Sequence, residues 1–148
     1  MKSIEHFMEG VRKAYVEDQA AKGIRASGAS AESLRIETSD EGGKLYGSAY
    51  FYQQIFGRRP GSFPPIEAIL EWMRVKGVQP SDEKTSERQL AFLIARKIAN
   101  SGTDIYQGKR PALSIEDRVV ELKENFKREF LGEYRAKLVD HIRQIILT

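Results

Sequence analysis

The feature that most constrains the fold of this 148-residue chain is an apolar repeat in its last quarter. From Ile115 onward, large apolar side chains recur every three or four positions, at Val119, Leu122, Phe126, Phe130, Tyr134, Leu138, Ile142 and Ile145. This is the period of an amphipathic α-helix, and Gly132 is the one point where such a helix is expected to bend. At about 1.5 Å per residue the helix is about 45 Å long, which exceeds the width of a compact domain of this size. A helix that extends beyond its own domain packs on neighbouring chains, so the spacing predicts self-association.

The composition excludes several classes of protein. The chain contains no cysteine, which rules out disulfide frameworks, cysteine-based zinc sites and thiol nucleophiles, and is compatible with a reducing compartment. No apolar run approaches the ~20 residues that a membrane span needs. The first residues, Met1–His6, lack the apolar stretch of a signal peptide. We therefore expect one soluble domain with a core of its own.

The net charge of +3 is distributed unevenly. Residues 1–43 carry a net charge of −2 and residues 114–148 a net charge of 0, whereas residues 44–113 carry +5. The middle segment is therefore where we expect contact with an anion.

Local patterns predict an α+β fold. Apolar spacing predicts helices over 4–22, 65–76 and 87–100, and alternation around the turn at 40–43 predicts a hairpin of two strands within 34–49. Together these elements indicate a small, mainly antiparallel sheet packed with helices, plus the long C-terminal helix. We expect a core over residues 1–113 and an assembly helix over 114–148.

Capping patterns and apolar faces sharpen the helix predictions. Ser86 with Gln89, and Ser114 with Asp117, have the spacing of capping boxes that start the last two helices. In the helix over 87–100 the buried face is expected to hold Leu90, Leu93, Ile94 and Ile98.

An aromatic cluster precedes Gly57. Its members are Tyr46, Tyr50, Phe51, Tyr52 and Phe56. We expect these rings to pack the sheet against a helix, because aromatic side chains supply much of the core of small domains. A stacking platform for nucleic acid bases is the alternative.

Patterns that would indicate catalysis are absent or incomplete. His6 and His141 stand alone, without a second ligand at metal-binding spacing, and no G-x-S-x-G nucleophile motif occurs. The stretch from Gly102 to Lys109 has the wrong spacing for a phosphate-binding loop, and Arg110 stands where Ser or Thr would bind magnesium. We expect no enzyme activity, no metal and no cofactor.

The basic side chains of the middle segment are the candidate contact residues. The candidates are Arg58, Arg59, Arg74, Lys76, Arg96 and Lys97. Arg58 and Arg59 lie in a loop bracketed by glycine and proline, from which they could reach phosphates or a partner's carboxylates; an ordinary solvated surface is an equal alternative. A helix-turn-helix is disfavoured, because about ten residues rather than three or four separate the two helices.

A succession of motifs resembles a known family. Residues 52–65 read YQQIFGRRPGSFPP, a helix with Trp72 and Lys76-Gly77 follows, and then come QLAFLIARKIA at 89–99 and Gly102-Thr103. This succession resembles the tail-completion (tail-component) proteins of tailed bacteriophages, in particular those of phages with Bacteroidetes-type hosts. The resemblance covers residues 32–105, and the long C-terminal helix departs from the shorter family members.

The resemblance implies a structural virion protein of the neck, assembled in the host cytoplasm. Such subunits form a ring, commonly of six or twelve copies, that joins the portal–adaptor assembly of the head to the tail terminator or tail tube, around the channel through which DNA passes. It implies that Arg58 and Arg59 face the channel or the adjoining ring, with transient, non-specific contact with DNA and none with a membrane. A weak positive charge suits a conduit, since tight phosphate binding would stall ejection.

Two alternatives stay open. Within virion proteins, the chain could be a tail terminator that caps the tail tube with a similar ring. From another class, it could be a small basic nucleic-acid-binding protein that acts as a monomer or dimer. The mass of the purified protein and its binding to short duplex DNA would separate these hypotheses.

Overall fold

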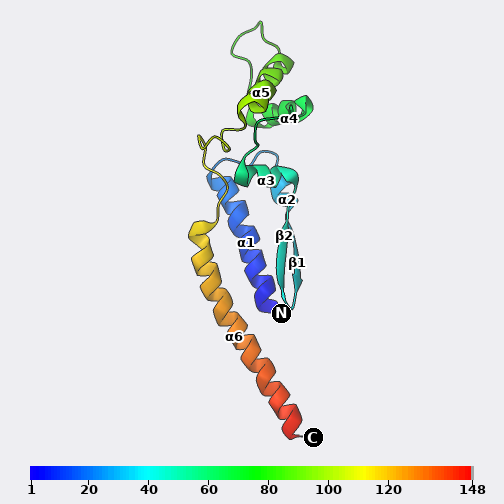
Figure 1. Ribbon diagram of the computed structural model, residues 1–148, viewed down its shortest axis with the longest axis vertical. Coiled ribbons are helices and arrows are strands. Elements are labelled where there is room, and N and C mark those ends of the chain that lie inside the picture. The colour runs from blue at the N-terminus through cyan, green and yellow to red at the C-terminus, as the bar shows by residue number, and fades with distance from the viewer. Residues whose placement is uncertain (148) are drawn as a thin grey trace. The chain divides into compact units, whose positions relative to one another are not determined.

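The computed structural model describes residues 1–147 and has an α+β fold with a long C-terminal helix (Figure 1). The elements are α1 (Lys2–Ala21), α2 (Ala29–Glu32), β1 (Arg35–Ser39), β2 (Gly42–Tyr46), α3 (Ala49–Phe56), α4 (Ile66–Lys76), α5 (Glu87–Ser101) and α6 (Glu116–Ile146). The sheet within the described residues is the antiparallel pair β1–β2.

The chain forms two compact units. The first unit takes residues 1–18, 34–46 and the chain from 114, and the second takes residues 19–33 and 47–113. The boundary expected between residues 113 and 114 is therefore one of the points where the chain passes from one unit to the other. The first unit also includes most of α1 and the hairpin, so α6 does not stand apart from them.

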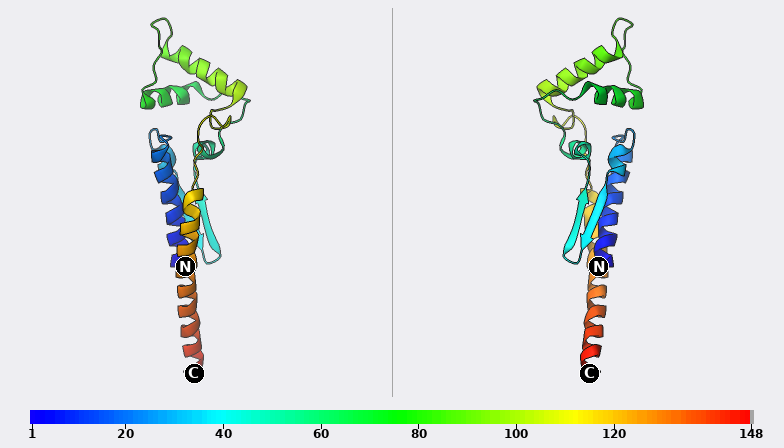
Figure 2. Two further views of the ribbon diagram at one scale, coloured as in Figure 1. Left: turned by 90° about the vertical axis from the view of Figure 1, so that its left-hand side faces the viewer. Right: turned by 90° about the vertical axis from the view of Figure 1, so that its right-hand side faces the viewer.

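In the first unit, α1 and α6 run antiparallel and side by side (Figure 2). Aromatic packing joins them, because the rings of Phe7 and Phe126 have centroids 5.2 Å apart. Gly10 gives the close approach: a Cβ built on it would come within 2.6 Å of Leu122 Cδ2. The apolar spacing that predicted α6 therefore serves, over its first part, to cover α1.

Polar contacts mark the two ends of this packing. Near the start of α6, Arg118 forms an ion pair with Glu17 at 2.9 Å. At the start of α1, the Ser3 backbone N–H and hydroxyl donate to the two carboxylate oxygens of Glu133, at 2.9 and 3.1 Å. The first residues of α1 thus lie beside Glu133, so we call residues 116–133 the proximal part of α6 and residues 134–146 the distal part. The helix continues through Gly132 without a break.

The hairpin packs on α1 in the same unit. Its register pairs Ile36 with Leu45 and Ser39 with Gly42, as expected for strands joined by a tight turn. Gly43 lies so close to α1 that a Cβ built on it would come within 2.4 Å of Met8 Cγ. The hairpin expected within 34–49 is confirmed, although its second strand ends at Tyr46.

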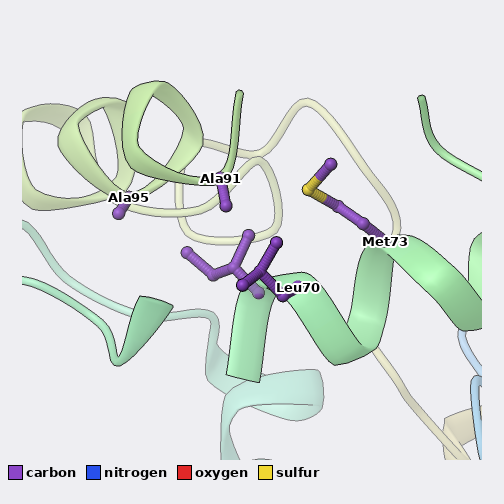
Figure 3. Packing of buried hydrophobic residues seen from close by; sticks show 5 residues of the cluster. Leu70, Met73, Ala91 and Ala95 are labelled. Atoms are coloured by element: carbon purple, nitrogen blue, oxygen red, sulfur yellow. The ribbon is translucent and has the colours of Figure 1, made fainter. Parts of the chain in front are cut away.

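In the second unit, α4 and α5 pack together around a small core (Figure 3). Ile69, Leu70 and Met73 of α4 meet Ala91 and Ala95 of α5, which are both completely buried. Because alanine has almost no side chain, two alanines one helical turn apart allow the helix backbones to approach closely. This is the centre of the second unit.

The buried face expected for α5 was partly wrong. Leu90, Ile94 and Ile98 pack against the core as expected, but Leu93 is 44% exposed. The stripe is rotated toward Ala91 and Ala95, whose small side chains carry little apolar signal in the sequence. The geometry of close packing, rather than side-chain size, decides which face is buried.

Two helices were missed and one cap was mistaken. The short α2 was not predicted, nor was α3, where Ser48 caps the helix by accepting a hydrogen bond from the Phe51 backbone N–H. Ser86 and Gln89 form the expected capping box of α5. The capping box expected at Ser114 does not form: the cap position of α6 is Ile115, and the Ser114 hydroxyl accepts a hydrogen bond from the Glu116 backbone N–H at 3.3 Å.

Candidate functional site

The distal part of α6, together with Leu131 at the end of the proximal part, exposes an apolar surface. We call it the distal apolar face, and its members are Leu131, Tyr134, Leu138, Val139, Ile142, Ile145 and Ile146. Each is between 45% and 76% exposed. At about 100° per residue, these positions cover about 140° of the helix circumference, on the side opposite to the one that meets α1.

The width of the distal apolar face indicates how it is covered. A two-stranded coiled coil needs only the narrow seam of its a and d positions, whereas a face wider than about 100° packs against more than one element. The charged residues along it are mildly basic: Arg135, which projects from within this arc, Lys137 and Arg143 outnumber Asp140, which lies 3.8 Å from Arg143. Neither α6 nor any other described helix combines the length and the apolar content that a membrane span needs.

The six basic residues expected as contacts lie in the second unit, but they are not equivalent. The Arg58 guanidinium donates to the Ser62 carbonyl oxygen at 2.9 Å, and the Lys76 ammonium donates to the carbonyl oxygens of Gly23 and Arg25, both at 2.8 Å. These two side chains fasten loops of their own unit.

The other four basic candidates are more accessible. Lys97 lies 3.7 Å from Asp104, in an exposed ion pair of little energetic weight. Arg59, Arg74 and Arg96 are exposed and make no side-chain hydrogen bond or ion pair within residues 1–147. These three are the side chains that a phosphate or a partner's carboxylate could engage.

The aromatic cluster is mostly on the surface, which contradicts the packing that we expected. Phe51 is 5% exposed and belongs to the interior, whereas Tyr46, Tyr50, Tyr52 and Phe56 are between 38% and 66% exposed. Tyr52 and Phe56 stack on each other with centroids 6.0 Å apart, one helical turn apart on α3. The sequence pattern missed this because α3 itself was missed.

A buried polar cluster in the second unit has one amide group without a full set of partners. Gln54 Oε1 accepts hydrogen bonds from Gln19 Nε2 at 2.7 Å and from Ser30 Oγ at 3.1 Å. Gln54 Nε2 and Gln19 Oε1 are buried and have no partner among the described residues. An unsatisfied buried polar group costs about 1–3 kcal/mol, so its position marks a place where a ligand atom or water oxygen is favoured.

Two hollows lie on the surface of the second unit and share part of their walls. The first, of about 530 Å³, is lined mainly by apolar residues of α4 and α5 and by Pro64 and Pro65; we call it the apolar hollow. The second, of about 230 Å³, is lined by Gln54 and by three cationic residues, Lys22, Lys76 and Arg110; we call it the basic hollow. Tyr50, Gln53 and Trp72 line both, so the two hollows are neighbours, and we call the pair the groove of the second unit. Arg58 and Glu71 are the charged residues that line the apolar hollow.

Within residues 1–147, no three His, Asp or Glu side chains are grouped closely enough to hold a metal ion. The comparisons with family models, with curated proteins and with solved structures find no match to this chain. The candidate surfaces are therefore the distal apolar face, the exposed arginines and the groove of the second unit.

Proposed function

We propose that this chain is a structural subunit that assembles into a ring at the head-to-tail joint of a tailed bacteriophage, in the neck of the virion. The observation that carries the proposal is the distal apolar face, which no other part of the first unit covers within residues 1–147. A helix that presents such a face is suited to packing against copies of the same subunit.

The distal apolar face is large enough to supply part of a subunit interface. Burying a large apolar side chain removes on the order of 100 Å² from water, since it contributes about 1.5–3 kcal/mol at about 25 cal/mol per Å². Seven side chains that are each about half exposed therefore offer on the order of 400 Å². That is about half of what one partner contributes to a standard interface, and it is the size of the largest apolar patch expected on a monomer.

The width of the face favours a ring over a two-chain pair. A face of about 140° has room for one neighbouring helix on each flank, as each subunit of a closed ring requires. The proposed number of copies is six or twelve, by resemblance of residues 32–105 to tail-completion proteins. In that setting the ring joins the portal–adaptor assembly to the tail terminator or tail tube.

The exposed arginines fit a channel or an adjoining ring. Arg59, Arg74 and Arg96 are free to meet phosphates or carboxylates, whereas Arg58 and Lys76 are held by backbone carbonyl oxygens. Few free cations per subunit favour transient, salt-dependent contact with passing DNA. The proposal assigns the chain no catalytic role.

Two other functions stay as alternatives. A tail terminator would form a similar ring at the end of the tail tube. A small nucleic-acid-binding protein would use the same arginines, and the exposed stacked pair of Tyr52 and Phe56 is the observation that favours it.

Mass and imaging test the proposal together. We expect the purified chain to elute as a discrete multimer by light scattering, or to become one when portal or adaptor protein is added, and to appear as rings in electron micrographs. Duplex DNA should bind weakly and lose affinity steeply with salt. A strictly monomeric protein that binds short duplexes tightly at physiological salt would contradict the ring and support the nucleic-acid-binding alternative.

A further inference from the structure

The groove of the second unit places two hollows of different chemistry side by side. Its apolar hollow is walled by Ala68, Ile69 and Val75 of α4 and by Ile94 and Ile98 of α5. Its basic hollow opens beside the shared residues Tyr50, Gln53 and Trp72. A ligand that fills both must be apolar at one end and complementary to cations at the other.

The basic hollow presents hydrogen-bond donors with positive charge and no carboxylate. None of its lining residues is acidic. The Lys76 ammonium is held by two carbonyl oxygens, which position it without neutralising its charge. Arg110 is exposed, and its guanidinium makes no hydrogen bond or ion pair with residues 1–147. An anionic group is therefore the complementary occupant.

We propose that this groove binds a peptide segment of a partner protein in which large apolar side chains are followed by carboxylates. The apolar side chains occupy the apolar hollow beside Trp72, and the carboxylates meet Lys76 and Arg110. Main-chain groups of the segment pass the shared wall formed by Tyr50 and Gln53. Binding here does not require the ring, so the inference stands apart from the proposed function.

Charge and shape favour this occupant over two others. The distal part of α6 from a second copy is apolar but carries Arg135, Lys137 and Arg143 against Asp140, so the basic hollow would repel it. A nucleic acid backbone offers phosphates to the basic hollow but leaves the apolar hollow exposed to water. A peptide with both features satisfies both ends of the groove.

Trp72 gives a direct readout, because it is the only tryptophan and lines both hollows. The probes are end-blocked peptides LLDDD, LLGDDD and LLGGDDD, whose different spacers allow for the distance between the hollows. Their counterparts with asparagine in place of aspartate keep the size and remove the charge. We expect at least one acidic peptide to change the Trp72 fluorescence saturably and its asparagine counterpart to bind at least about tenfold more weakly. Affinity should also fall as salt rises from about 50 to about 200 mM.

Variants separate the two ends of the groove. Arg110→Glu should weaken the acidic peptide at least about tenfold and leave its asparagine counterpart unchanged. Ala68→Arg, which fills the apolar hollow from an exposed position on α4, should weaken both peptides. Arg59→Glu makes the same charge change outside the groove and should leave binding within about twofold. Melting of each variant, followed by circular dichroism, establishes that the fold is intact.

Three results would overturn the proposal. The first is the absence of a saturable fluorescence change with any acidic peptide. The second is equal binding of acidic and asparagine peptides. The third is a short single-stranded oligonucleotide that binds more tightly than every peptide and whose affinity Ala68→Arg leaves unchanged, because that would assign the basic hollow to nucleic acid. A chain that proves monomeric but binds the acidic peptide would contradict the ring and leave the groove intact.

Discussion

The proximal part of α6, residues 116–133, and the distal part, residues 134–146, share one apolar period but differ in what covers their side chains. In the proximal part, Phe126 meets Phe7 of α1 and Leu122 lies against Gly10. In the distal part, α1 has ended, and Leu138 and Ile142 are 48% and 46% exposed. The same sequence pattern thus encodes an intramolecular interface over one stretch and, by our proposal, an intermolecular one over the next.

The period of apolar residues alone therefore does not distinguish residues that pack within the chain from residues that are available for assembly. Two features distinguish the parts: α1 runs for 20 residues and α6 for 31, and the apolar side chains of the distal part lie on the side of α6 opposite to the one that meets α1. The excess length and the turn of the apolar stripe together carry the information about assembly. Substitutions on the two parts should separate stability from association.

The largest effect is expected from a charge on the distal apolar face. Leu138→Glu should weaken association by at least about 100-fold, or about 3 kcal/mol, because a carboxylate would be buried without a partner. Light scattering over a dilution series measures this change. The melting temperature of the isolated subunit should not fall, since Leu138 is half exposed there.

Ala136→Glu is the matched control for this prediction. It adds the same carboxylate to the same part of α6, on the side where the proximal part meets α1 and outside the distal apolar face. Association should stay within a few fold of the unchanged chain. If both substitutions weakened association equally, net charge rather than the distal apolar face would drive assembly.

An effect of similar size, on stability rather than on association, is expected from truncation in the proximal part. Phe126→Ala should lower the free energy of unfolding by about 2–4 kcal/mol, because its ring packs on both Phe7 and Phe130. Ile142→Ala should change it by less than about 0.5 kcal/mol. Urea unfolding of both variants in a Leu138→Glu background, which we expect to be monomeric, makes the comparison. A large loss at Ile142 would mean that the distal part is covered within the monomer.

The boundary between the two parts gives an intermediate prediction. Glu133→Ala should cost about 1–2 kcal/mol of unfolding free energy, since its carboxylate accepts two hydrogen bonds from Ser3 at the N-terminus of α1. Asp140→Ala, two turns further along, should cost almost nothing, because its ion pair with Arg143 is exposed. Equal losses at both positions would place the end of the α1–α6 contact beyond Glu133.

The sequence predicted the elements whose local signals agree with their packing. The long helix, the hairpin and the capping box at Ser86 and Gln89 are confirmed, because apolar period, turn residues and cap spacing all act within a few residues. No sequence signal shows where α1 ends relative to α6. Only the antiparallel pairing in space divides α6 into a covered and an exposed part.

The sequence failed where small or aromatic residues carry the packing. Ala91 and Ala95 form the buried face of α5 by allowing close approach, and a search for large apolar side chains selected Leu93 instead. The aromatic residues from Tyr46 to Phe56 were interpreted only as packing between the sheet and a helix, so the helix that the cap at Ser48 starts, α3, was not predicted. The groove was missed as a site because its lining is gathered from α3, α4, α5 and three loops.

The smallest effect is expected from two glycines inside helices, which test the boundary by steric means. Gly132→Ala should raise the unfolding free energy by about 0.5–1 kcal/mol, because a Cβ there meets nothing within 4 Å and alanine favours a helix. Gly10→Ala has the same helical gain, but its Cβ would displace Leu122 Cδ2, so the gain is offset. In urea unfolding, the free energy of unfolding should therefore be higher for Gly132→Ala than for Gly10→Ala. The reverse order would contradict the proposed extent of the part of α6 that α1 covers. Gly132→Ala could also raise the unfolding free energy of the monomer and yet weaken its association. That result would place the subunit interface at Gly132, where α1 ceases to cover α6.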